Sequence, residues 1–204
     1  MTATQTVQST ARRAIVRADV LAMTEYAKIR RERRRAMIEQ KKLRRLEVGP
    51  SACFYFENYD TMWLQVHEML FIEKGGEAQI ADELDAYNAL IPQGRELVAT
   101  VMFEIADEVQ RRNFLARLGG VEHTMFMSFA GETVAALPEE DAERTNEQGK
   151  ASSVHFVHFP FTDQQVAMFR QPNTQVVVGF KHPHYGHMAV MPEGVRAALA
   201  QDFD

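Results

Sequence analysis

Apolar residues between positions 19 and 48 recur every three or four residues, which predicts one long helix. Asp19 is a candidate N-cap for this helix, and Gly49 followed by Pro50 is a candidate stop signal. The apolar stripe is narrow, because charged residues occupy many of the other positions. Such a helix can lie on a surface or along a partner, but it cannot be buried on all sides.

A helical hairpin is predicted in the next part of the chain. Residues 53–60, CFYFENYD, resemble an aromatic strand that runs into a turn. Apolar positions from Trp63 to Leu70 then recur at helical spacing, and a further helix is predicted over residues 77–90. Residues 16–94 are therefore expected to form a helical region with one aromatic strand.

From residue 95 onward the hydrophobic period becomes that of strands, and a βαββ order occurs twice. Matching segments recur at offsets of 56, 55 and 55 residues. They are FEIAD (103–107) with FPFTD (159–163), Phe114 with Phe169, and LPE (137–139) with MPE (192–194). So steady an offset favours an internal duplication.

These patterns predict an α+β fold. A basic N-terminal helix and a helical hairpin would be followed by two tandem βαββ units, which form an antiparallel or mixed sheet with helices on one face. Residues 1–15 are polar and unpatterned, so we expect a disordered tail there. Residues 95–204, the duplicated region, are expected to form one globular unit with residues 16–94.

Charge is distributed very unevenly along the chain. Ten basic residues stand against two acidic ones between Lys28 and Arg45, a net charge of +8. Because the whole chain carries −5, the remainder carries −13. A strongly cationic helix is thus attached to an acidic body.

Three kinds of contact could use such a helix. Nucleic acid would exploit phosphate neutralisation, but the segment lacks stacking aromatic residues and the body is acidic. A membrane surface would require a wider apolar face. Docking on an acidic protein surface, its own or a partner's, is the favoured interpretation. The candidate contact residues are Arg30, Arg31, Arg33, Arg34, Arg35, Lys41, Lys42, Arg44 and Arg45.

The segment KHPHYGHMAV, residues 181–190, holds three of the seven histidines. His182, His184 and His187, with His158 as a fourth candidate, could bind iron or zinc through their imidazoles. The spacing matches no established ligand signature, however, and no carboxylate lies nearby in sequence. The alternative is a hairpin in which histidine is an ordinary polar residue.

A second candidate polar site comprises Glu57, His67 and Glu68, where a histidine and carboxylates could act as an acid/base pair. The spacing from Trp63 to His67 places the imidazole on or beside the apolar stripe. A hydrogen-bonded core histidine is therefore favoured.

The remaining composition is that of an ordinary globular protein. Cys53 is the single cysteine and is expected to behave as a small hydrophobic residue within the aromatic strand. No apolar run approaches the length of a membrane span, and the N-terminal residues lack the apolar core of a secretory signal. A reducing cytoplasm is therefore the expected compartment.

Several sequence blocks make the chain similar to the bacterial domain-of-unknown-function family 3501. They are EYAKIRRERRR (25–35), FYFENYDTMWLQVHEML (54–70), KASSVHFVHFPFT (150–162) and HPHYGHMAV (182–190). The resemblance runs from about Ile15 to Asp204 and implies no activity. It does imply a neighbourhood of rubrerythrin-like di-iron and iron–sulfur redox proteins, beside which such proteins are typically encoded.

The leading hypothesis is a cytoplasmic accessory protein of a redox or oxidative-stress module. It would bind an iron–sulfur or di-iron protein through the basic helix. A metal-binding protein or metal-dependent enzyme that uses the histidines is the alternative, and nucleic-acid binding is the weaker one. No nucleophile or phosphate-binding motif occurs in the sequence, so an enzyme is the less favoured class.

Overall fold

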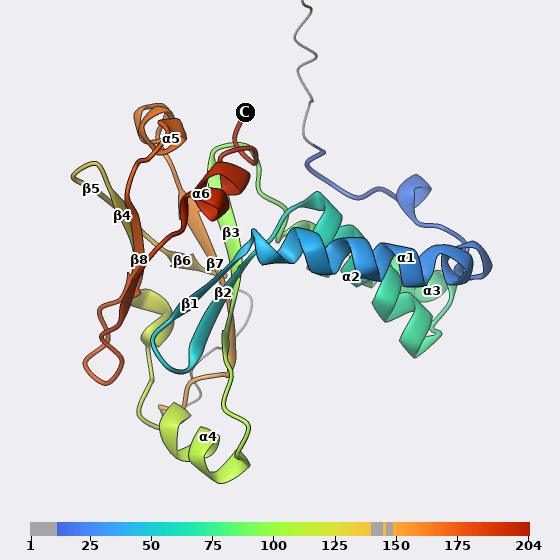
Figure 1. Ribbon diagram of the computed structural model, residues 1–204. Coiled ribbons are helices and arrows are strands. Elements are labelled where there is room, and N and C mark those ends of the chain that lie inside the picture. Colours follow the sequence, from blue (N-terminus) through green and yellow to red (C-terminus); the bar gives the residue numbers. More distant parts are fainter. Residues whose placement is uncertain (1–11, 140–144, 146–148) are drawn as a thin grey trace, which may run out of the picture.

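The computed structural model describes residues 12–139, 145 and 149–204 as two antiparallel sheets with a layer of helices beside them (Figure 1). Sheet A has five strands in the spatial order β1 (Arg45–Val48), β2 (Ala52–Phe56), β3 (Glu96–Phe103), β7 (Val154–Pro160) and β6 (Leu137–Pro138). Sheet B has four, in the order β5 (Glu132–Ala135), β4 (Met125–Phe129), β8 (Val176–Phe180) and β9 (Met188–Val190).

Six α-helices and two short 3₁₀ turns complete the described chain. The helices are α1 (Met23–Lys42), α2 (Tyr59–Glu73), α3 (Glu77–Asn88), α4 (Glu108–Leu115), α5 (Asp163–Arg170) and α6 (Glu193–Leu199). The 3₁₀ turns are η1 (Arg17–Asp19) and η2 (Val121–His123). No helix in the described ranges is long and apolar enough to cross a membrane.

The α+β class and the repeated βαββ order are confirmed. Equivalent strands of the two repeats pair with each other, β3 with β7 and β4 with β8, both antiparallel. Each repeat gives its first strand to sheet A and its later strands to sheet B. The strands therefore form two sheets rather than one, because the apolar inner faces of the two sheets cover each other.

The main core lies between the two sheets. Alternate residues of β7, such as Val157 and Phe159, point into it and are fully buried. Phe54 of sheet A contacts Phe180 of sheet B, with ring centroids 5.3 Å apart. Such aromatic pairs across the layers fix how the sheets sit on each other.

A second core covers the outer face of sheet A. The α2–α3 hairpin contributes Val66, Leu70 and Ile80, which pack with Val98 of β3. Sheet A is thus covered on both faces at Val98, whereas the outward-facing side chains of β7 are only half-buried. The predicted helical hairpin and the aromatic strand β2 are both confirmed.

The long basic helix is shorter than predicted. It begins at Met23 and ends at Lys42, and residues 45–48 form strand β1 instead of a last helical turn. Side chains in β1 alternate between exposed and buried, with Leu46 and Val48 in the core. Asp19 does not cap this helix, because its carboxylate accepts a hydrogen bond from the backbone of Val16 within η1.

The expected tail, residues 1–15, lies outside the described residues up to position 11. The next residues are attached to the body. Ile15 is 2% exposed in the second core, and Arg13 donates hydrogen bonds to the carbonyls of Pro92 (2.9 Å) and Asp202 (2.8 Å). Residues 12–15 therefore belong with the helical layer.

A buried tyrosine connects the β1–β2 turn to the loop between β8 and β9. The Tyr185 hydroxyl donates to the carbonyl of Val48 (2.8 Å) and accepts from the backbone amides of Ser51 (3.1 Å) and Ala52 (3.0 Å). Gly49 has a φ of +71°, and a Cβ there would lie 2.8 Å from this hydroxyl. Only glycine fits this turn, so the turn and the tyrosine are matched to each other.

We expect Tyr185→Phe to lower the free energy of unfolding by about 2 to 3 kcal/mol, because it leaves two amides and one carbonyl without their buried partner. Urea denaturation checks this value. Tyr87→Phe is the matched control, because among the described residues the Tyr87 hydroxyl accepts a single, long hydrogen bond, from Gln65 at 3.4 Å. Equal losses for the two variants would contradict the role given to Tyr185.

Candidate functional site

The inner face of α1 is bound to α2. Tyr26 and Met37 are buried, and the Tyr26 ring lies 4.9 Å from the ring of His67. The Arg30 guanidinium donates two hydrogen bonds of 2.8 Å to Glu68, which also accepts from the Tyr26 hydroxyl at 2.6 Å. The hydrogen bond from Arg30 lowers the pKa of Glu68, and Tyr26 adds to this effect. Glu68 is thus a structural carboxylate that holds α1 in place.

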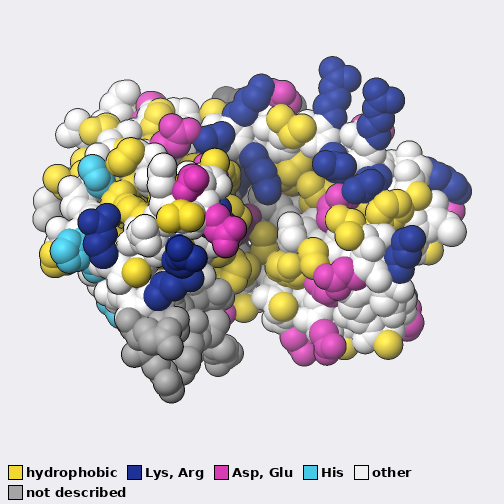
Figure 2. All heavy atoms as spheres, turned by 90° about the horizontal axis from the view of Figure 1, so that it is seen from below, with side chains coloured by type: hydrophobic (Ala, Val, Ile, Leu, Met, Phe, Trp, Pro, Cys, Tyr) yellow, Lys and Arg dark blue, Asp and Glu magenta, His cyan; other side chains and the backbone are white. Residues whose placement is uncertain are grey.

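The outer face of α1 is strongly cationic. We call it the basic face and define it by its exposed residues at helical spacing: Arg31, Arg34, Arg35, Ile38 and Lys42. Within the described part of the chain, Arg31 and Arg35 form no ion pair, and Arg34 reaches Glu68 only at 3.8 Å. Lys and Arg side chains gather over the helical layer in Figure 2. Ile38, 61% exposed, places an apolar group among them.

The predicted contact residues therefore do not form one surface. Arg44 is 4% exposed, and its guanidinium binds the Asp202 carboxylate and the carbonyls of Phe56 and Glu57, both at 2.9 Å. Its inclusion in a partner-binding surface was wrong, because its donors are used inside the protein. The sequence pattern predicted one helix up to the stop at Gly49, whereas α1 ends at Lys42 and Arg44 lies beyond it.

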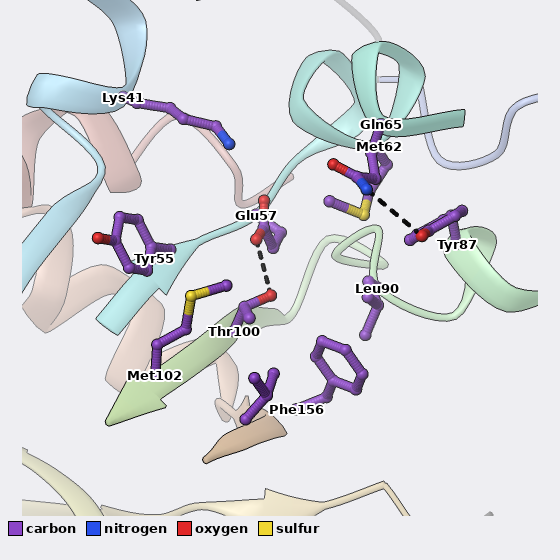
Figure 3. A pocket seen from close by; sticks show the side chains of 11 residues that line it. Lys41, Tyr55, Glu57, Met62, Gln65, Tyr87, Leu90, Thr100, Met102 and Phe156 are labelled. Atoms are coloured by element: carbon purple, nitrogen blue, oxygen red, sulfur yellow. Dashed lines mark hydrogen bonds between the residues drawn. The ribbon is translucent and has the colours of Figure 1, made fainter. Parts of the chain in front are cut away.

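The other members lie at the sides of α1 or beyond it. Arg33 stacks on Trp63, with its guanidinium carbon 5.3 Å from the ring centroid. Arg45, in strand β1, lies over Tyr55 and beside Glu47. Lys41 points toward sheet A rather than outward (Figure 3).

A cleft of about 220 Å³ separates the outer face of sheet A from the helices. In Figure 2 it is the hollow between the sheets and the helical layer. Its polar floor is Glu57, which is 5% exposed and accepts a hydrogen bond of 2.8 Å from the Thr100 hydroxyl. Figure 3 shows Lys41 above Glu57, with Met62 on the α2 side. Glu57 alone of the second predicted site lines this cleft.

His67 is a core residue, as the favoured interpretation predicted. It has no exposed surface, its Nε2 accepts from the Leu21 amide (3.0 Å), and its Nδ1 lies 2.7 Å from the Trp63 carbonyl. Accepting at Nε2 places the ring proton on Nδ1, which donates to that carbonyl. Burial lowers the pKa of His67, so the ring is neutral and fully bonded. Glu57, His67 and Glu68 therefore lie in three different environments and do not form one site.

The histidines of residues 181–190 do not converge. His182 is buried, with Nδ1 accepting from the His184 amide (3.2 Å) and Nε2 within 3.3 Å of the Gly119 carbonyl. His184 is exposed, and the His187 ring packs on Tyr185 with centroids 4.5 Å apart. Among the described residues, no group of three or more His, Cys, Asp or Glu side chains is arranged so that it could hold a metal ion. Binding of iron or zinc here stays a prediction.

His158, the fourth candidate ligand, lies in sheet A between two carboxylates. Its Nδ1 is 2.9 Å from Glu96 and its Nε2 is 3.2 Å from Glu139. The hydrogen bond to Glu96 raises the pKa of His158, and Glu139 adds to the effect. Burial of His158 opposes this increase. Burial also acts to raise the pKa of Glu96, but the hydrogen bond and the charge of His158 act against it, and the pKa of Glu96 is lowered. His155, three residues earlier in β7, points toward sheet B, so the two histidines lie on opposite faces of sheet A.

Comparison with known proteins supports the resemblance seen in the sequence. Residues 14–203 match the family model DUF3501, described as a protein of unknown function. A crystal structure of a novel protein of unknown function from Burkholderia pseudomallei K96243 is 39% identical, with a TM-score of 0.87. The match covers 94% of this chain and 100% of that one. A search of the curated proteins gave no match.

The His158 ion pairs predict a specific pH dependence. The pKa of His158 is higher in the folded protein than its ordinary value of 6.5. The ion pairs of His158 therefore stabilise the fold fully below pH 6.5, and this stabilisation is lost as the pH rises through the pKa of His158 in the folded protein. In the wild-type protein the free energy of unfolding should fall between about pH 6 and about pH 8, and in His158→Gln it should fall less over the same range. Urea denaturation across this range measures it. His184→Gln, at an exposed histidine, should keep the wild-type slope; equal slopes for all three proteins would rule out the assignment.

Proposed function

The chain belongs to the DUF3501 family, and we propose that it is a binding protein whose basic face docks on an acidic surface of a partner protein. The observation that carries this proposal is the contrast between the two faces of α1. Arg30 on the inner face is neutralised by Glu68, whereas Arg31 and Arg35 on the outer face form no ion pair with any described residue. A single helix thus separates structural cations from available ones.

The apolar residues around these cations support a protein partner. Ile38 is 61% exposed within the basic face, and Leu43, directly after α1, is 50% exposed. Protein interfaces combine apolar contacts with a charged rim that steers association. Arginine is well suited to this task because its planar guanidinium binds carboxylates in a bidentate manner.

The charge of the remaining chain argues for a compact acidic partner rather than nucleic acid. Outside residues 28–45 the chain carries −13, which would repel a phosphate backbone beyond the immediate contact. The iron–sulfur and rubrerythrin-like proteins implied by the family resemblance are the partner class to test first. In this proposal the chain is their accessory, and it supplies the docking surface.

The test is the affinity of purified protein for an acidic iron–sulfur or rubrerythrin-like protein from the same organism, measured by surface plasmon resonance across a salt series. We expect binding that weakens as salt increases, because exposed charge pairs are screened. The double variant Arg31→Glu/Arg35→Glu should weaken it at least about tenfold.

The matched control is Arg112→Glu/Arg117→Glu, which reverses two exposed arginines of the α4 region. Figure 1 shows α4 and α1 at separate ends of the molecule. The control should bind like wild type. Equal weakening by both double variants would show general electrostatic attraction, and no binding at low salt would refute this partner class. Tight binding to unrelated DNA would instead favour the nucleic-acid alternative.

A further inference from the structure

Glu57 is a buried carboxylate, 5% exposed, that forms no ion pair with any residue the structure describes. It follows β2 directly, and its backbone is fixed on both sides, by the Val98 carbonyl that accepts from its amide (2.8 Å) and by Arg44. Its side chain is bonded to the neutral Thr100 hydroxyl and forms no ion pair with a described residue. A carboxylate taken out of water is costly unless a cation or several hydrogen bonds compensate it.

The walls around Glu57 are apolar and adaptable. Met62 from α2 and Met102 from β3 face each other across the cleft, and Phe156 closes it toward β7 (Figure 3). Methionine adapts its shape to different ligands, and an aromatic face attracts a cation. Apolar walls with a few polar groups are typical of sites for small organic molecules.

Lys41 extends from α1 toward Glu57 but does not form an ion pair with it. Lys41 is half-buried, and α1 ends one residue later. A ligand that neutralises Glu57 must therefore compete with a nearby cation of the protein. This arrangement gives Lys41 and Glu57 opposite effects on a cationic ligand.

We infer that the cleft binds a small protonated amine with an apolar body. The ammonium group would donate hydrogen bonds to Glu57, and the apolar body would lie between Met62, Met102 and Phe156. This inference is independent of the proposed docking function, because it uses the opposite face of α1. Loss of one activity leaves the other in place.

The test uses 2-phenylethylamine, with 2-phenylethanol and 3-phenylpropionate as neutral and anionic analogues of similar shape. Binding to the full chain is measured by isothermal titration calorimetry and by NMR of methyl-labelled methionines. We expect the amine to bind at least about tenfold more tightly than either analogue and to shift the Met62 and Met102 signals.

Two variants sharpen the test. Glu57→Gln keeps the shape and the Thr100 contact and should weaken amine binding about tenfold, whereas Lys41→Gln should strengthen it. Glu73→Gln, at an exposed carboxylate at the end of α2, is the control and should change nothing. Circular dichroism confirms that each variant is folded. The comparison of the three analogues in the wild-type protein tests the inference even if a variant does not fold.

Three results would overturn the inference. The alcohol could bind as tightly as the amine, which would show that Glu57 contributes no charge recognition. The carboxylate analogue could bind best and lose affinity in Lys41→Gln, which would make the cleft an anion site. No binding of any of the three probes would show that the cleft is a packing defect that Lys41 covers.

Discussion

The buried guanidinium of Arg44 is the contact on which the arrangement of the layers depends. It joins the end of α1, the end of β2 and the C-terminal Asp202 through one set of hydrogen bonds. Because one of these bonds goes to the Glu57 carbonyl, Arg44 also fixes the backbone of the residue whose carboxylate lines the cleft. A buried ion pair of this kind adds little net stability over apolar packing, but losing one partner is strongly destabilising. The main effect of the Arg44 ion pair is to hold the end of α1, the end of β2 and Asp202 in one fixed relative position.

Sheet A separates two environments that have different roles. Its inner face packs on sheet B with aromatic and branched side chains, and this core holds most of the buried apolar residues. Its outer face is only partly covered by α2 and α3, so room is left for the cleft. Function is therefore expected on the helical side, where the basic face and the cleft lie on opposite sides of α1. The inter-sheet side supplies rigidity.

Local periodicity in the sequence predicted the elements well, because it depends on nearest neighbours. The hairpin α2–α3, strand β2 and both βαββ repeats follow directly from spacing. The division into two sheets depends on which apolar faces meet, and α6 was not predicted. The contacts of Arg44 could not be predicted, since Asp202 is 158 residues away in sequence. Likewise, the histidines made residues 181–190 look like a metal site. The residue of this segment that forms the long-range hydrogen bond in the structure is Tyr185, whose hydroxyl donates to the Val48 carbonyl.

The tyrosine at the β1–β2 turn also constrains the order in which the chain can be assembled during synthesis. Its hydroxyl meets a backbone carbonyl 137 residues earlier, so the first hairpin leaves the ribosome with two amides and a carbonyl that await a late residue. Contacts of such long sequence separation form slowly and late. The β1–β2 turn therefore gains these three hydrogen bonds only after residue 185 has been synthesised.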